Sequence, residues 1–424
     1  MKTEIRNGRV IDPANGVDTI QSIFIGAGKI LALGQPPAEF VAEKTIDARG
    51  KIVCPGLVDL CARLREPGAE HKATLESELL AAVAGGITTL VCPPDTEPVL
   101  DEPGLVEMLT RRAQALHQAK VYPLGALTVG LRGEQLAEMA ELAEAGCIAF
   151  FHADQPIANN MVLYRAMQYA ATFDYPVWLR PQDAALAAGG LAHEGEMATR
   201  LGLQGIPVSA ETVAIATILI LMRETGARVH LARLSSAAAV DMVRDAKAAG
   251  LPLTCDVGIH HLLLSDRDLG YFDSQYRFTP PLRDPRDRDA LRHGVAEGVI
   301  DAICSDHTPV DDDEKQVPFG EAAPGASGVE MLLSLTLKWA EAAAQPLATA
   351  LARITCEPAR VLGVQAGELA VDAPADICIF DPGAYWAVTG KTLRSQGKNS
   401  PYIGRELQGR VMHTLVNGRL VYSA

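Results

Sequence analysis

PGLVDLC (55–61), LESELLAAVAGG (75–86) and GITTLVCPP (86–94) are the segments that decide the fold of this chain. The first and third are short apolar runs of the kind that form buried strands, and the middle one has helical apolar spacing and ends in glycine. A strand, a helix and a second strand in this order predict one βαβ unit of a parallel sheet.

The same alternation continues for another two hundred residues, with helical patterns between strand-like runs. Those runs are KVYPLGALT (120–128), GCIAFFHA (146–153), YPVWLRP (175–181), ARVHLARLS (227–235), PLTCDVGIH (252–260) and GVIDAICSD (298–306). With the first two they number eight, the number that closes a (β/α)8 barrel. We therefore expect an α/β fold with a TIM barrel over 55–363, and a helical region at 328–363 that covers its flank.

The two ends of the chain resemble each other. IRNGRVID (5–12) and LVNGRLVYS (415–423) both place Asn-Gly between apolar runs, a pattern that favours a turn between antiparallel strands. We expect 1–54 and 364–424 to form one small β domain, with the barrel inserted between its halves. The apolar stretches ILILM (218–222) and LLSLTL (332–337) fit either barrel packing or an oligomer surface.

Composition excludes several classes of protein. The chain has 424 residues, nearly half of them apolar, and a formal net charge of -14. No basic run offsets this charge, so we expect no nucleic-acid partner. No stretch resembles a signal peptide or a membrane span, and the eight cysteines include no C-x-x-C pair, so we expect a cytoplasmic protein with reduced core thiols. The acidic stretch 310–325 is the segment we expect to be mobile.

Barrel enzymes carry their chemistry on the residues that follow the strands. A hydrolytic metal site there needs several imidazoles or carboxylates around an open position. This chain instead has arginines at several of those places, and it contains no H-x-H pair. Arginine stays protonated and cannot ligate a cation. The candidate residues at the strand ends are Cys61, Arg63, Arg65, Asp95, His152, Ala153, Asp154, Arg180, Asp183, Arg233, His260, His261, Asp306 and His307.

Several long motifs in one order resemble the dihydroorotase family of the amidohydrolase superfamily, from end to end of the chain. They are KIVCPGLVDLCARLREPG (51–68), CPPDTEPV (92–99), HEGEMATRLGLQGIP (193–207), HHLLL (260–264), TPPLRDPRDRDAL (279–291), CSDHTP (304–309) and EAAPGASGVE (321–330). Active members carry two zinc ions on an H-x-H after the first strand, an aspartate after the fourth and histidines after the fifth and sixth. An aspartate after the eighth strand acts as general base and acid.

The resemblance maps these positions residue by residue. The metal positions fall at Cys61, Arg63, Ala153, Arg180 and Arg233, and we interpret all five as degenerate; a shift of one residue would place His152 at the fourth strand. The general base survives as Asp306, which we interpret as vestigial. The substrate-binding positions fall at Arg65, which matches, and at Asp95 and Thr279, which stand where the family has asparagine. We expect guanidinium-carboxylate pairs around Asp306, and no metal and no cofactor.

The resemblance implies a pseudoenzyme. Inactive dihydroorotase-like chains accompany the aspartate carbamoyltransferase catalytic chain of pyrimidine biosynthesis as structural subunits, so the expected partner is that chain, in a hetero-oligomer with self-association. Two alternatives stay open. One is a working hydrolase of cyclic amides with a reorganised metal site, for which His152, His260, His261 and His307 are the available imidazoles. The other is a small-anion-binding protein that uses the arginines. Cys61 as a nucleophile lacks an evident partner base.

Overall fold

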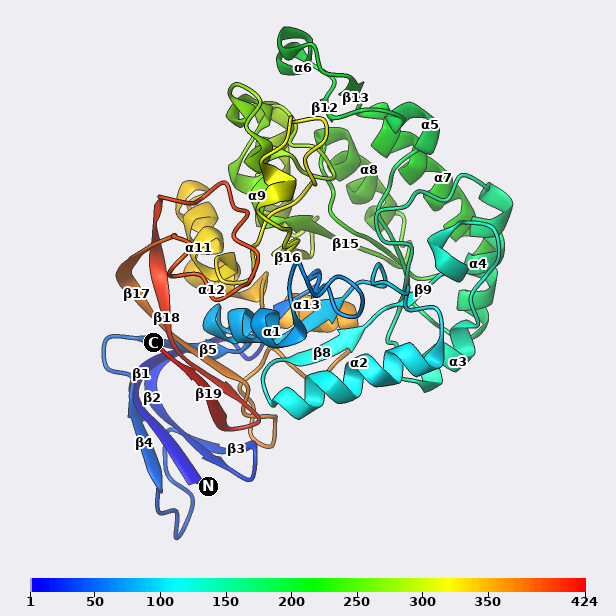
Figure 1. Cartoon of the computed structure of the whole chain (residues 1–424). Helices are drawn as coiled ribbons and strands as arrows, with labels where there is room; N and C mark the ends of the chain where they lie inside the picture. The colour runs from blue at the N-terminus through cyan, green and yellow to red at the C-terminus, as the bar shows by residue number, and fades with distance from the viewer. Residues whose placement is uncertain (1) are drawn as a thin grey trace.

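The computed structural model describes residues 2–424 and contains the expected barrel (Figure 1). Nine short strands fill the eight predicted positions, because Leu124 divides the third run into two strands. They are β6 (Leu57–Asp59), β7 (Ile87–Cys92), β8 (Lys120–Pro123), β9 (Gly125–Ala126), β10 (Phe150–Phe151), β11 (Val177–Leu179), β14 (Val229–Leu231), β15 (Leu253–Gly258) and β16 (Ala302–Cys304). Neighbouring strands are parallel, and a parallel bridge between Ala62 and His307 joins the last strand to the first. The predicted barrel fold is confirmed.

Helices surround these strands, as Figure 1 shows. They are α1 (Leu75–Ala84), α2 (Pro103–Leu116), α3 (Met139–Glu144), α4 (Asn160–Thr172), α5 (Ala184–Ala187), α7 (Ser209–Thr225), α8 (Ala237–Ala248), α9 (Ile259–Leu263), α10 (Pro285–Glu297), α11 (Leu332–Ala342), α12 (Leu347–Ala352) and α13 (Cys356–Leu362). Short 3-10 turns occur at η1 (Val129–Leu131), η2 (Asp266–Leu269), η3 (Ser274–Tyr276) and η4 (Asp313–Lys315).

Local sequence explains where several of these helices begin. The Thr74 side chain accepts a hydrogen bond from the Ser77 amide at the start of α1, and Ser77 returns one to Thr74. At the start of α10 the Asp284 side chain accepts a hydrogen bond from the Asp287 amide, directly before Pro285 at the first helical position. Such caps satisfy amide groups that have no partner within the helix.

The apolar stretches divide between the core and the surface. The leucines of LLSLTL lie on α11, where Leu332, Leu333 and Leu335 are buried. On α7, Ile218 and Leu219 are buried, whereas Ile220 is 55% exposed. Both stretches therefore contribute chiefly to packing within the chain. No helix of residues 2–424 has the length and apolar character to cross a membrane.

The two ends of the chain build one sheet beside the barrel. Its strands are β1 (Lys2–Asp12), β2 (Val17–Gly26), β3 (Lys29–Leu33), β4 (Lys44–Asp47), β5 (Ile52–Pro55), β17 (Ile377–Ala387), β18 (Glu406–Val416) and β19 (Arg419–Ser423). β17 pairs with β5, with Cys378 opposite Cys54, so the C-terminal strands extend the N-terminal sheet. Figure 1 shows both termini within it.

Only one of the two Asn-Gly pairs forms a turn. Asn417 and Gly418 connect β18 to β19, both with positive φ, as predicted. The turn predicted at Asn7-Gly8 is wrong: β1 continues through this pair, which forms a bulge in its pairing with β2. A side chain on Gly8 would lie 2.5 Å from a Val53 methyl group, so close strand packing explains the glycine.

Two excursions leave the barrel near its mouth. One is a projecting arm made of β12 (Ala192–His193), α6 (Glu196–Leu201) and β13 (Gly205–Ile206). The other is the stretch 310–325. Asn399 accepts a hydrogen bond from the Val310 amide, and Arg277 donates one to the Phe319 carbonyl group. The mobility of 310–325 stays a prediction.

Candidate functional site

The ends of six barrel strands bring charged side chains together at one place. Arg63 follows β6, Asp95 follows β7 and Asp154 follows β10, while Arg180, Arg233 and Asp306 follow β11, β14 and β16. This is the end of the barrel where enzymes of this fold carry their chemistry. We call these six residues the arginine-aspartate cluster.

Asp154 is the centre of the cluster. Its Oδ2 lies 2.7 Å from Nη2 of Arg63, and its Oδ1 lies 2.7 Å from Nε of Arg180. Arg233 donates a further short hydrogen bond to Oδ1 through Nη2. Burial raises the pKa of Asp154, but Arg233, Arg63 and Arg180 outweigh it and hold that pKa well below its ordinary value. One carboxylate therefore pairs with three guanidinium groups.

Asp306 lies deeper than Asp154 and has fewer partners. Its Oδ1 accepts a hydrogen bond of 2.9 Å from Nη1 of Arg233 and lies 3.7 Å from Nη1 of Arg63. Burial raises the pKa of Asp306 above its ordinary value, although both arginines lower it. The predicted ion pairs between the arginines and Asp306 are present, but Asp154 rather than Asp306 collects most of the contacts.

The charges of the cluster balance. Arg63 also pairs with Asp95 at 2.7 Å between Nε and Oδ2, so the cluster contains three carboxylates and three guanidinium groups. The side chains of Arg63, Arg180 and Arg233 are at most 5% exposed. Since an unpaired charge at such burial costs several kcal/mol, about 3–5 when one partner is removed, the pairing explains how three arginines can lie there.

The structure places Ala153 and Asp154, the two residues after the fourth strand position, in different surroundings. The resemblance places the family's fourth-strand aspartate at Ala153, but the Ala153 side chain is buried in an apolar cluster with Phe151 and Trp178, and the next residue, Asp154, faces the arginines. Ala153 has φ of 49°, a left-handed conformation that turns the chain directly after β10. The carboxylate that faces the arginines is therefore Asp154, one residue beyond the position that the resemblance assigns to the family's aspartate.

The cluster does not fit a pair of zinc ions. Guanidinium groups have no lone pair to offer a metal, and three of them would repel a dication. Cys61 is the remaining candidate ligand beside the three carboxylates. Its Sγ lies 3.8 Å from Oδ1 of Asp306, and burial raises the pKa of the thiol well above its ordinary value. That thiol is therefore protonated, which also argues against Cys61 as a nucleophile.

The predicted substrate-binding positions lie beside the cluster, around a cavity of about 220 Å³. The Nε of Arg65 donates to the Pro309 carbonyl group at 2.8 Å. Asp95 is held by Arg63, and Thr279 contributes its backbone carbonyl group, which accepts a hydrogen bond of 3.2 Å from Arg233. Of the three, only Asp95 is therefore held by the cluster through its side chain, and Arg65 is the charged side chain that the cluster leaves free.

The four histidines at the strand ends do not assemble a replacement metal site. His152 contacts Thr128 and a backbone carbonyl group, His261 contacts the Pro280 carbonyl group, and His260 stacks on Tyr402. His307 lies 2.6 Å from Glu78 through Nε2. Within residues 2–424, a different group has ligand atoms close enough together to hold a metal ion, namely His193, Asp284 and Asp287.

Comparison with known proteins identifies the family. The family model described as "Dihydro-orotase-like" matches residues 50–239, and that described as "Amidohydrolase family" matches residues 196–422. A "Dihydroorotase-like protein" of Pseudomonas aeruginosa is 48% identical over 422 residues and covers 100% of both chains. The chain belongs to the dihydroorotase-like family of amidohydrolases.

Other relatives of this dihydroorotase-like chain carry a different name. A "Dihydroorotase" of Citrifermentans bemidjiense is 39% identical, again over 100% of both chains. Among solved structures, an L-hydantoinase (dihydropyrimidinase) from Arthrobacter aurescens matches with a TM-score of 0.88 and 25% identity, covering 99% of this chain and 96% of the other. A D-hydantoinase at 22% identity, with a TM-score of 0.84, supports the fold alone.

Proposed function

We propose that this dihydroorotase-like chain is a non-catalytic subunit that supports assembly of the aspartate carbamoyltransferase catalytic chain in pyrimidine biosynthesis. The observation that carries the non-catalytic part is the pairing of Arg63, Arg180 and Arg233 with Asp154 and Asp306. On the family mapping, these three arginines stand where zinc ligands are required.

The chemical consequence of that replacement is large. Zinc lowers the pKa of bound water from about 15.7 to about 7, so without its ligands the nucleophile is lost together with the Lewis acid. General acid or base catalysis by Asp306 alone supplies about 10²- to 10⁴-fold, against a typical enzyme total of about 10⁶-fold or more. Asp306 is moreover engaged by Arg233, which removes it from a substrate.

The partner rests on the family resemblance, supported by the 48% identity to a protein named dihydroorotase-like. The test is to purify the transferase catalytic chain of the same cell with and without this chain and to measure molar mass by light scattering. We expect a larger hetero-oligomer, a higher unfolding temperature of the transferase and a change in its activity. If the molar mass, unfolding temperature and activity of the transferase are unchanged by this chain, the proposed partner is wrong.

Arg65 supports a second candidate, the binding of a small anion. Among residues 2–424 its only side-chain hydrogen bond is from Nε to Pro309, and the guanidinium group lines the cavity beside the cluster. Arginine forks suit carboxylates. Dihydroorotate or carbamoyl aspartate would then raise the unfolding temperature saturably, and Arg65→Met would abolish the shift. The absence of any shift with the unaltered chain would refute this candidate.

A further inference from the structure

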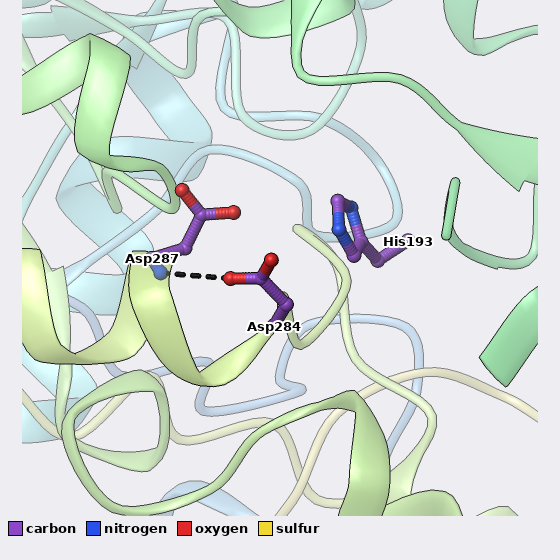
Figure 2. A group of neighbouring side chains, drawn as sticks. All are labelled: His193, Asp284 and Asp287. Atoms are coloured by element: carbon purple, nitrogen blue, oxygen red, sulfur yellow. Dashed lines mark hydrogen bonds between the residues drawn. The ribbon is translucent and has the colours of Figure 1, made fainter. Parts of the chain in front are cut away.

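A second polar site lies away from the arginine-aspartate cluster, under the projecting arm. A cleft of about 800 Å³ separates the arm from η2 and the start of α10, and both His193 and Asp284 line it. Figure 1 shows α6 standing out from the barrel at this point, and Figure 2 shows the side chains at the base of the arm. The cleft therefore lies between an exposed element and the barrel body.

His193, Asp284 and Asp287 converge there. Each offers one ligand atom, and these atoms all lie within 4.8 Å of one another. Each carboxylate is oriented by a backbone amide: Asp284 accepts from Asp287 N at 2.9 Å, as drawn in Figure 2, and Asp287 accepts from Ala237 N at 2.8 Å. In each case one oxygen atom is used, and the other is left for a further partner.

A fourth residue adds an unsatisfied carboxylate oxygen to the cleft. Asp266 is 5% exposed and lines the same cleft, yet its Oδ1 accepts no hydrogen bond within the described chain. Over residues 2–424, neither Asp266 nor Asp284 nor Asp287 forms an ion pair with lysine or arginine, although Arg283 is near enough to lower the pKa of Asp287 and arginines also line the cleft. Leaving a buried carboxylate oxygen unsatisfied is costly, so a cation bound in the cleft would stabilise this arrangement.

We propose that His193, Asp284 and Asp287 bind a divalent transition-metal ion, with Asp266 as an outer carboxylate that adds negative charge. One imidazole and two carboxylates suit zinc, manganese or cobalt rather than a soft copper site. The ion would connect β12 to α10 and so fix the base of the arm. This site is independent of the degenerate one at the barrel mouth, and it departs from the sequence-based expectation that the chain holds no metal.

Arg283 contacts the imidazole ring of His193 and affects how that ring can bind an ion. Its Nη1 lies 3.2 Å from Nδ1 of His193 and also donates to the Ile206 carbonyl group at 2.9 Å. Because arginine can only donate, Nδ1 accepts in this arrangement, and Nε2 is the nitrogen left to face a metal. Metal binding at Nε2 puts the proton on Nδ1, where a ligating histidine normally meets an acceptor. Arg283 therefore opposes binding, and its contact with His193 must open when the ion enters.

The experiment is a calorimetric titration of the full chain, after chelation and dialysis, with Zn²⁺, Mn²⁺ and Co²⁺ separately. We expect one site for at least one of these ions. His193→Ala and Asp287→Asn should each weaken binding at least tenfold, in the range that changes around metal ligands produce. Arg283→Gln should tighten binding several-fold, because the glutamine oxygen can accept the Nδ1 proton.

Two controls separate this site from the cluster and from misfolding. Asp289→Asn, on the same helix but half exposed, should leave the affinity unchanged, and so should Asp306→Asn. Limited proteolysis within 194–204 should slow when the ion is added to the unaltered chain. No binding by any of the three ions, or binding that survives His193→Ala unchanged in a folded variant, would overturn the proposal and leave the proposed function untouched.

Discussion

Replacing Asp154 by asparagine removes the charge on which the arginine-aspartate cluster depends while keeping the size of the side chain. Three guanidinium groups contact Asp154, so after the change Asp95 and Asp306 alone face three arginines, and the cluster carries one excess positive charge. Removing one partner of a buried ion pair costs about 3–5 kcal/mol. The Asp154 side chain is 28% exposed, and water screens part of the charge, so we expect the lower end, about 3 kcal/mol.

Urea unfolding at pH 7 measures this loss, with Asp174→Asn as the matched control. Asp174 also pairs with an arginine, Arg228, at 2.7 Å, but its side chain is 81% exposed, so its loss should cost less than about 1 kcal/mol. The pKa of Asp154 lies below its ordinary value in the folded chain. Its stabilisation is therefore complete above the unfolded pKa of about 3.9 and declines as the pH falls through the folded pKa, so the deficit of the Asp154 variant should shrink in acid. Equal losses in the two variants at pH 7 would refute the reasoning.

Three further predictions concern buried groups. Burial raises the pKa of Asp59 to about 6, so the folded chain holds a proton that the unfolded chain releases near pH 3.9. The free energy of unfolding should therefore fall by up to about 3 kcal/mol as the pH rises from about 4 to about 6. Asp59→Asn should lose that pH dependence in a series of urea titrations. All eight cysteines are buried, so none should react with a thiol reagent in the native chain and all eight should react in urea; a native thiol that reacts at once would contradict the structure. Glu78→Gln breaks the buried contact with His307 and should lower the free energy of unfolding by about 3 kcal/mol in the same assay. Glu107→Gln, in an exposed helical pair, should lower it by less than about 0.5 kcal/mol. A Glu78 variant as stable as the Glu107 variant would show that the buried contact is not stabilising.

The sequence predicted the barrel because the βα alternation repeats over 250 residues, so that an error at one boundary does not change the count. It also predicted which side chains stand at the strand ends. It placed Asp154 at the end of the fourth strand but did not assign it a role. A left-handed residue such as Ala153 decides which side chain faces the cluster, and nothing in the residue type of alanine indicates that conformation.

Other features depend on contacts distant in sequence. Asn7-Gly8 has the composition of a turn, and only packing against Val53 makes it a bulge within a strand. His193 approaches Asp284 across ninety residues, and each lies in a motif that gives no sign of the other. Such sites appear only when the elements that carry them are placed in space.

The most direct test of the account is dihydroorotate ring opening by the purified full chain saturated with Zn²⁺, followed together with ring closure of carbamoyl aspartate. The arginines at the ligand positions predict no turnover above buffer in either direction, with or without the ion, and the same result for Asp306→Asn. Because turnover is the readout, zinc bound beside His193 does not affect the outcome. Zinc-dependent turnover that Asp306→Asn abolishes would contradict the central claim and would make this chain a working dihydroorotase.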